Sequence, residues 1–558
     1  MHIAGGVPAT LAARRLRALV PIAEVRPSLT QLCMTIDREY EKRLSGLTNG
    51  GAAHALQGGL KGVEKESLRV KPDGRISQTP HPVALGSALT NETITTDYSE
   101  ALIELVTPPL HQSWELVQFL CDLHQFVYRH LEDELLWATS MPCAVKGDAS
   151  IPIARFGTSN VGRMKHVYRV GLAHRYGRVM QAISGVHFNY SFPEDFWPVL
   201  ADLCRSHDSA QDFRSDAYFA LLRNYRRHGW IVLYLFGNSP AICESFLVGR
   251  KVEGLQELTP GTLYAPHATS LRMSDLGYRN KNQAGVSVSV NSLDHYVRDL
   301  NHAITTPHPD YEQIGVKVDG EYRQLNANWL QIENEYYSFI RPKRVARTGE
   351  RPTRALQRAG VQYVEMRSLD VSAFDPVGVN QIKLRFLEAF AAFCVLRASP
   401  AIEPAEQAEL DGNHALVARR GREPGLALRR DGRDISLADW ALEIVDSMRG
   451  VCELLDEGDA DRPYLTALEM QEAKVRDPAR TPAARTLLEL HTTGESFFNF
   501  ALRMSKQHKA YFLELYSPNE TRQIEFAARA KASLAEQAHI ERQDSLDFDQ
   551  YLARYFAG

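Results

Sequence analysis

Apolar and polar residues alternate with a period of two in several segments of the chain, and such alternation is typical of half-buried β-strands. The segments are residues 58–70, 184–192 and 361–371, and residues 94–108 add a β-like apolar run, ALIELV, with Glu104 inside it. In the first segment Glu64 and Glu66 fall on one face, and Val63 and Lys65 fall on the other, because residues two apart share a face. The pattern therefore predicts strands whose two faces differ in chemistry.

The polar faces of these predicted strands carry carboxylates, an imidazole and a guanidinium. The residues are Glu64, Glu66, Glu104, His187, Asn189, Glu365 and Arg367. Two carboxylates on one strand face lie roughly 6–7 Å apart and repel each other, whereas hard divalent cations bind carboxylate oxygens. The pattern indicates a metal site built from several carboxylates. The alternative is that these acids line a solvent-exposed strand face, and we expect Glu100 on a solvated turn or strand end.

Helical spacing, with apolar residues three and four positions apart, covers much of the remaining chain. It predicts helices over residues 110–135, 165–181, 211–236, 378–398, 436–456, 463–475, 483–508 and 519–537. Residues 401–434 are acidic and then basic, and we interpret them as a polar linker or excursion. Strands mixed with many helices favour an α/β (α+β) fold.

The chain has 558 residues, which is enough for a large core and for more than one domain. We expect an N-terminal extension (1–36), a catalytic domain (37–400) and a mainly helical C-terminal part packed on that domain (401–558). The extension resembles a transit peptide in composition; a disordered tail or a start codon assigned too early are the alternatives. A hydrophobic content of 44% and a charged content of 24% are typical of a soluble globular protein.

Charge and cysteine content narrow the class of protein. A net charge of −4 gives no general attraction to nucleic acid or membranes, and no apolar run approaches the ~18 residues that span a bilayer. The seven cysteines are scattered without a CxxC pair. This argues against a zinc ribbon or a secreted disulfide scaffold and favours a reducing compartment. We expect a cytoplasmic monomer that binds neither nucleic acid nor membrane.

Residues 331–356 run from a polar strand into a basic segment that contains Arg341, Lys343 and Arg344. Such a segment is either a solvated loop or a phosphate-binding lid, since arginine forks match phosphate oxygens. Together with the carboxylates it suggests several Mg²⁺ ions and a polyphosphate. The residues alone do not name the substrate, and no Walker A, Rossmann or HExxH motif occurs at a usable position.

Eight motifs occur in an order that resembles glutamate–cysteine ligase of the proteobacterial type, also called γ-glutamylcysteine synthetase. They are VEKESLRV, ALGSALTNETITTDYSEALIELVTP, RFGTSNVGRMK, QAISGVHFNYSFP, YLFGNSPAIC, ATSLRMSDLGY, LQIENEYYSFIRPKR and YVEMRSLDV. The resemblance covers residues 57–400 closely and continues more loosely to the end of the chain. It departs at the N-terminal extension and in the divergent helical C-terminus.

This resemblance implies a glutamine-synthetase-like catalytic domain, in which a curved, mostly antiparallel sheet forms a funnel. It implies that ATP phosphorylates the γ-carboxylate of L-glutamate and that the α-amine of L-cysteine then displaces phosphate to give γ-glutamylcysteine. ATP is a co-substrate, several Mg²⁺ or Mn²⁺ ions bind at the site, and glutathione is an expected feedback inhibitor. The alternatives are a ligase for another amine, a guanidino-kinase-like phosphotransferase, and a catalytically silent nucleotide- or metal-binding regulator.

The resemblance also implies roles for individual residues. The metal ligands are Glu64, Glu66, Asp97, Glu104, His187 and Glu365. Arg367 faces the transferring phosphoryl group, and the nucleotide lies near Asn334, Arg341, Lys343, Arg344 and Arg367. The substrate-binding residues are Arg272, Tyr278, Tyr337, Tyr168, Gln181 and Tyr98. Because the attacking amine must be neutral, we add the hypothesis that Asp97 accepts its proton.

Overall fold

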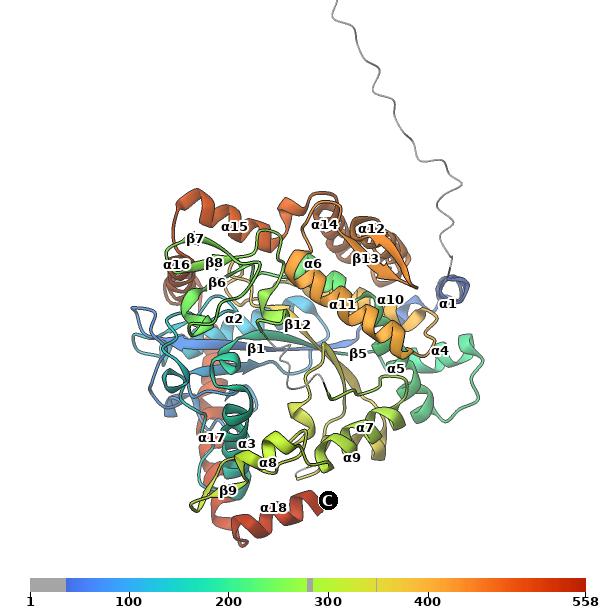
Figure 1. Cartoon of the computed structure of the whole chain (residues 1–558). Helices are drawn as coiled ribbons and strands as arrows, with labels where there is room; N and C mark the ends of the chain where they lie inside the picture. Colours follow the sequence, from blue (N-terminus) through green and yellow to red (C-terminus); the bar gives the residue numbers. More distant parts are fainter. Residues whose placement is uncertain (1–36, 278–284, 348, 558) are drawn as a thin grey trace, which may run out of the picture.

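The computed structural model describes residues 37–277, 285–347 and 349–557. An antiparallel seven-stranded sheet with the order β11-β12-β5-β1-β3-β2 crosses its middle, and β4 pairs with β1 beside this path (Figure 1). The strands are β1 (Leu60–Val70), β2 (Ile94–Thr96), β3 (Leu102–Val106), β4 (Leu135–Leu136), β5 (Gly185–Ser191), β11 (Ile340–Lys343) and β12 (Tyr363–Asp370). The predicted strands are confirmed, with residues 94–108 forming two paired strands, β2 and β3.

Three smaller sheets lie outside the central one. The first consists of β6 (Ala241–Cys243), β8 (Thr262–Tyr264) and β7 (Gln256–Thr259). The other two are the pairs β9 (Lys317–Val318) with β10 (Glu321–Tyr322), and β13 (Ala427–Arg430) with β14 (Arg433–Ser436).

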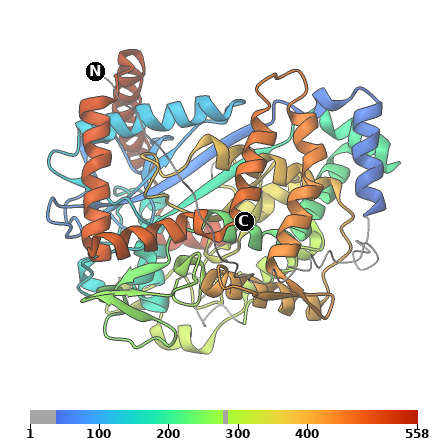
Figure 2. The same cartoon turned by 90° about the horizontal axis from the view of Figure 1, so that it is seen from above.

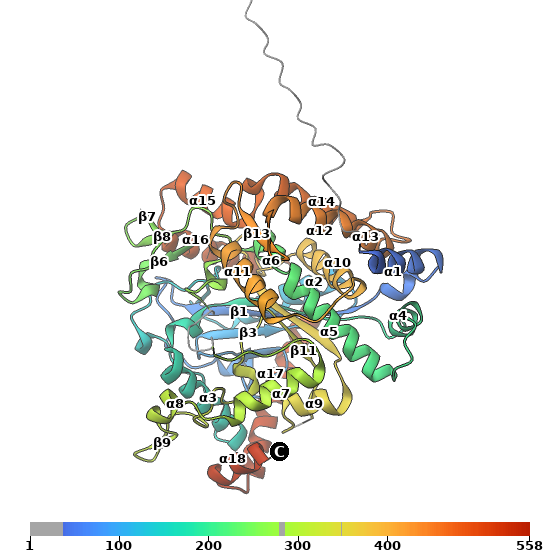
Figure 3. The same ribbon diagram turned by 45° about the vertical axis from the view of Figure 1, so that its right-hand side comes forward.

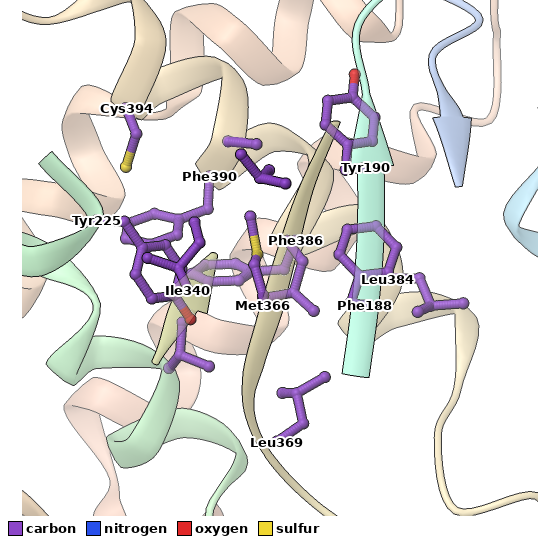
Figure 4. Close-up of a cluster of buried hydrophobic side chains, with 14 of the residues drawn as sticks. Phe188, Tyr190, Tyr225, Ile340, Met366, Leu369, Leu384, Phe386, Phe390 and Cys394 are labelled. Carbon is purple, nitrogen blue, oxygen red and sulfur yellow. The ribbon is translucent and has the colours of Figure 1, made fainter. Parts of the chain in front are cut away.

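Helices cover both faces of the central sheet (Figure 1). On one side lie α2 (Ser113–Arg129), α5 (Ala210–His228), α6 (Trp230–Phe236) and α10 (Gln381–Leu396), and on the other lie α3 (Asn160–Tyr176), α7 (Leu293–Thr305), α8 (Pro309–Ile314) and α9 (Pro352–Ala359). The first group packs on the apolar strand face, where Phe188 and Met366 meet Phe386 and Phe390 of α10 and Tyr225 of α5 (Figure 4). Figure 3 shows α5 beside α10 at the end of the sheet.

The remaining helices lie at the N-terminus and in the last third of the chain. They are α1 (Arg38–Asn49), α4 (Phe196–Cys204), α11 (Pro404–Arg420), α12 (Leu437–Ser447), α13 (Arg449–Leu455), α14 (Pro463–Arg476), α15 (Pro482–Thr493), α16 (Phe497–Ala510), α17 (Glu520–Gln543) and α18 (Phe548–Ala557). Seen from above, the orange and red helices of the C-terminal region lie over the sheet and along its edge (Figure 2).

Several sequence expectations differ from the structure. The helices expected over 436–456 and 483–508 are each two helices, α12 with α13 and α15 with α16. The single helix expected over 211–236 is two helices, α5 and α6, which meet at Gly229, where a side chain would come within 2.4 Å of the Tyr225 carbonyl oxygen. The interpretation of 401–434 as a polar linker was wrong. That segment forms the helix α11 and the hairpin β13–β14. Their buried residues Val417 of α11 and Leu428 of β13 are too widely spaced among charged residues to give an amphipathic signal.

The main hydrophobic core crosses residue 400 without a break. It includes Phe390 and Phe393 of α10 together with Trp440 of α12, Leu468 of α14 and Phe526 of α17. Residues before and after position 400 therefore share one core. Burial of these large side chains in a common cluster supplies much of the folding free energy.

Two of the cysteines depart from the expectation of scattered thiols. Cys143 and Cys243 form a disulfide that links the segment after β4 to β6, with their Cα atoms 5.4 Å apart. The bond was missed because its two cysteines lie 100 positions apart in the sequence. Within the described ranges, no helix has both the length and the apolar character needed to cross a bilayer.

Candidate active site

The strand register brings the predicted acids together in one row on the polar face of the sheet. Glu66 of β1 lies opposite Glu104 of β3, and Glu64 of β1 lies opposite His187 of β5. Glu365 of β12 lies between Asn189 of β5 and Arg341 of β11. Directly opposed residues on neighbouring strands share a face, so these side chains converge although they lie far apart in the sequence.

The first group of converging ligands is Glu64, His187 and Glu365. The Nδ1 atom of His187 lies 3.0 Å from Oε2 of Glu64 and 3.5 Å from Oε1 of Glu365. Asn189 donates its amide N–H to the other Glu64 oxygen at 3.0 Å and thereby orients that carboxylate. One ligand atom from each residue of the group lies within 4.8 Å of the others, which fits a single cation.

The second group consists of Glu66, Glu104 and His187, and their ligand atoms satisfy the same 4.8 Å limit. His187 therefore belongs to both groups. Burial, with the charge of Arg367, lowers the pKa of its imidazole, so the ring is neutral and has a lone pair for a metal. One oxygen of Glu66 accepts a hydrogen bond from the Gly185 backbone N–H at 2.6 Å, which fixes the carboxylate against β5.

The second group carries more negative charge than the protein alone compensates. Burial and the charge of Asp97 raise the pKa of Glu66 to about 8. Burial and the charges of Glu64, Asp97, Glu66 and Glu365 raise the pKa of Glu104 well above its usual value. Carboxylates held together in this way without a cation repel each other, and a bound divalent ion removes that cost.

Cations of the protein surround the first group instead. Burial alone would raise the pKa of Glu365, but the charges of Lys343 and Arg367 hold it well below its usual value. Arg367 donates to Oε1 of Glu365 at 2.9 Å, and Nζ of Lys343 lies 3.3 Å from Oε2. The exposed fraction of Glu365 is 1%, so these ion pairs are shielded from solvent. The net charge along the row therefore changes from negative around Glu104 to positive around Arg367.

A cavity of about 130 Å³ opens beside this row. It is lined by Glu66, Asp97 and Arg367 and by residues of α3 and of the loop 334–341. Several substrate- and nucleotide-binding residues predicted from the sequence lie on its wall: Tyr98, Tyr168, Gln181, Asn334, Tyr337 and Arg341. Asp97 itself follows β2 and faces the cavity outside both ligand groups.

Helix α3 holds one wall of this cavity in place. It begins after Ser159, whose hydroxyl accepts a hydrogen bond from the Gly162 N–H, as N-cap residues do. In the middle of α3, a side chain at Gly171 would come within 2.1 Å of Gln331, so glycine permits the close approach of the loop. Glu335 of that loop accepts hydrogen bonds from Arg175 and Tyr176 at 3.0 and 2.7 Å.

Arg344 and Arg272 are not among the residues that line the cavity. Arg344 donates to the carbonyls of Ala359 and Gly360 at the end of α9, away from the cavity, because it follows Lys343 and alternation turns it to the other side. Arg272 is buried beneath the polar face, where it donates to the Arg367 carbonyl at 3.1 Å. Tyr278 lies outside the described residues.

The structure adds site residues that the sequence analysis missed. Arg169 of α3 lines the cavity and donates to the Asp97 carbonyl, and Lys165, one turn earlier, interacts electrostatically with Glu104. Their spacing of four residues on a basic helix was the available signal. Leu172, Tyr176 and Met180 give the cavity an apolar part that periodicity could not distinguish from core packing.

Glu100 was expected in solvent, and this expectation was wrong. Its exposed fraction is 9%, and its carboxylate accepts hydrogen bonds from the backbone N–H groups of His81 and Arg155, both at 2.8 Å. Glu100 therefore ties two loops to β3 and is separate from the metal-binding groups.

Comparison with known proteins shows the family of this chain. The sequence matches the glutamate-cysteine ligase family model over residues 44–417. The chain belongs to the glutamate–cysteine ligase family. It is 49% identical over 524 residues to the glutamate–cysteine ligase of Alcanivorax borkumensis, which covers 93% of this chain and 99% of that protein. It is also 49% identical to the Pseudomonas entomophila enzyme, with coverage of 92% and 97%.

Solved structures of the ligase family share the fold. The crystal structure of the Francisella tularensis glutamate–cysteine ligase in complex with AMP is 37% identical, has a TM-score of 0.84, and is matched over 90% of this chain and 98% of that one. A bifunctional glutathione synthetase from Pasteurella multocida is 25% identical with a TM-score of 0.69, and 58% of that longer chain is covered. These matches confirm the expected mixed α/β fold with an antiparallel sheet.

Proposed function

We propose that this chain uses ATP to join the γ-carboxylate of L-glutamate to the α-amine of L-cysteine, giving γ-glutamylcysteine, ADP and phosphate. The observation that supports this most directly is the row of polar side chains on the sheet. In this row the two ligand groups, which share His187, lie next to Arg367 and Lys343. Such a row offers a place for cations and a place for phosphate oxygens side by side. Membership in the glutamate–cysteine ligase family supplies the identity of the substrates.

The residues present fit divalent metal ions. Each ligand group contains two carboxylates and one neutral imidazole, and oxygen-rich sets of this kind suit Mg²⁺ or Mn²⁺. Glu64 and Glu365 would hold one ion, and Glu66 and Glu104 would hold another, with Asp97 nearby. The single lone pair of the neutral His187 ring would complete one of these two sets. When bound, such ions neutralise the charge of the triphosphate and polarise the transferring phosphoryl group.

The first step forms a bond between a γ-carboxylate oxygen of glutamate and the γ-phosphorus of ATP, and breaks the bond to the β-phosphate oxygen. Arg367 and Lys343 would bind the phosphoryl oxygens, because both cations are fixed by Glu365 at the positive end of the row. Arg341 and Asn334, which line the cavity, would orient the nucleotide.

In the second step the cysteine α-amine attacks the acyl phosphate, and phosphate leaves. The amine must lose a proton, and Asp97, which lies on the cavity wall, would accept it. Tyr98, Tyr168, Gln181 and Tyr337 would hold the acceptor amino acid, and the apolar patch of Leu172 and Met180 suits a small thiol side chain. An amino acid whose side chain has one small group more or less than cysteine should be discriminated from cysteine by about 1–3 kcal/mol.

The test measures ADP release with each amino acid omitted in turn and identifies the product by mass spectrometry. We expect ADP and γ-glutamylcysteine only when glutamate, cysteine and a divalent metal are all present. Amide formation with another amine in place of cysteine would redirect the proposal, and a phosphorylated product without an amide would refute it. Feedback inhibition by glutathione, a cytoplasmic location and a monomeric state stay predictions of the family resemblance.

A further inference from the structure

A second cavity, of about 230 Å³, lies on the apolar side of the sheet and shares no lining residue with the catalytic one. Its walls come from α5, the end of α10, α11, the β13–β14 hairpin and α12, which lie together in Figures 1 and 3. The volume corresponds to roughly eight water molecules. It is therefore large enough for a small metabolite.

Four arginines line this cavity: Arg227, Arg397, Arg429 and Arg430. Two of them are held rigidly over aromatic rings, since the Arg397 guanidinium lies 5.1 Å from the Phe393 ring centre and that of Arg430 lies 5.2 Å from Trp440. Among the described residues, Arg430 uses only Nη1 in a hydrogen bond, to Glu443 at 2.9 Å. Its other N–H groups are therefore available to a ligand.

A buried histidine forms the floor of the cavity. His228 has an exposed fraction of 8% and is wedged between the rings of Phe393 and Trp440. Its Nδ1 atom is buried and, within the described part of the chain, has no hydrogen-bond partner. A buried polar atom without a partner costs about 1–3 kcal/mol, so its presence beside a cavity indicates a missing partner.

The charged groups around His228 indicate whether the missing partner is an anion or a cation. Burial and the positive charges of Arg397, Arg227 and Arg430 hold the pKa of His228 well below its usual value. Four acids also line the cavity: Glu406, Glu409, Asp431 and Glu443. Glu406 is engaged by the Arg227 fork at 2.6 and 3.0 Å and Glu443 by Arg430, and Glu409 accepts a hydrogen bond from the Gly432 N–H at 3.3 Å. Arg397 pairs with Asp37 at 3.4 Å. The charges that act on His228 are those of Arg397, Arg227 and Arg430, so the His228 side of the cavity favours an anion.

We propose that this cavity is a second binding site, for a small organic carboxylate or phosphate whose oxygens contact Arg430, Arg397 and His228. Trp440, Leu410 and Pro400 form an apolar wall for the carbon part of such a ligand. The chemistry shared by both ligand types is an oxyanion bound by guanidinium groups, the geometry that arginine forks recognise.

The test is calorimetry on the full chain with ADP, Mg²⁺ and glutamate at saturating concentration, so that the catalytic cavity is filled. Succinate and inorganic phosphate are titrated separately at constant ionic strength. We expect saturable binding of at least one of them. Arg430→Gln should weaken it by about 10- to 100-fold, the range for one charged hydrogen bond. Arg433→Gln, on the facing strand of the same hairpin but outside the cavity, is the matched control and should bind within twofold of the wild type.

Binding of succinate alone would identify a carboxylate site, and binding of phosphate alone a phosphate site. Absence of saturable binding with both anions would overturn the proposal, as would equal affinities of Arg430→Gln and Arg433→Gln. If Arg430→Gln fails to fold by circular dichroism, Arg397→Gln takes its place with the same expected loss. In addition, histidine-selective NMR of the wild type should show that the bound anion raises the pKa of His228, and an unchanged pKa would count against the site.

Discussion

Replacement of Glu66 by glutamine should have opposite effects on stability and on activity. The Glu66 side chain is buried at 5% exposure, close to Asp97 and Glu104, and its pKa is raised to about 8. Glutamine has nearly the same shape and keeps a carbonyl oxygen for the Gly185 N–H. The substitution therefore removes a negative charge without leaving a cavity.

The size of the stability effect follows from the pKa. In metal-free protein the folded state retains a proton on Glu66 that the unfolded state releases above pH 4.5. Stability should therefore fall as the pH rises from 4.5 to 8 and then level off. At pH 7 the free energy of unfolding is lower by about 3 kcal/mol, because each unit between pH 4.5 and pH 7 costs 1.36 kcal/mol. Glu66→Gln should recover it and raise Tm by roughly 3 °C, given ~2 cal/mol/K of unfolding entropy per residue.

The assay compares melting curves in chelator and in Mg²⁺ with the rate of ADP release. Glu66→Gln should melt higher than the wild type in chelator, gain less stability from Mg²⁺, and lose about 10²–10³ in turnover. Glu134→Gln is the control, because this buried carboxylate pairs with Arg69 at 2.7 Å. It should lower Tm by roughly 3–4 °C and keep the activity. A lower Tm for Glu66→Gln in chelator, or an undiminished gain from Mg²⁺, would refute the reasoning.

Further predictions concern other parts of the molecule. Arg341→Gln should lower kcat/KM for ATP by about tenfold or more, whereas Arg344→Gln, which loses only its contacts at the end of α9, should stay within about twofold; equal losses in steady-state kinetics would place both in the site. Burial lowers the pKa of Lys65 to about 7, so the folded state releases a proton that the unfolded state keeps, and stability should rise between pH 7 and 10.5. That rise should be smaller in Lys65→Met melting curves, and an identical rise would contradict the assignment. Peptide mapping without reductant should recover Cys143 joined to Cys243, and reduction should lower Tm, because a loop of 100 residues is worth up to about 4–5 kcal/mol in the entropic account; unchanged melting after confirmed reduction would contradict this.

Alternation in short segments was sufficient to predict which side chains would share a face. Glu64 and Glu66 were placed on one face from their spacing alone, and the strand β1 has that geometry. Which strands are neighbours does not follow from such a local pattern. The pairing of Glu66 with Glu104 and of Glu365 with Asn189 depends on long-range register, which the hydrophobic packing of both faces selects.

The residues that sequence reasoning missed share a physical cause. Arg169 and Lys165 lie on α3, where basic side chains are ordinarily solvated, and their approach to Asp97 and Glu104 depends on how the helix docks on the sheet. Arg344 shows the reverse error, because its place in a basic run favoured a site role while backbone alternation directs it to α9. A run of charged residues in the sequence indicates the type of interaction, and the fold determines which of those residues take part in it.

The continuous core across residue 400 limits how this protein can be shortened. Phe390 and Phe393 pack in the same cluster as Trp440 and Phe526, so a chain that stops after α10 would leave large aromatic surfaces of its own helices facing water. Such a fragment should aggregate rather than act as a minimal ligase. Truncations that leave this protein folded should therefore be confined to the chain ends and surface loops, because the central sheet and the late helices share one core.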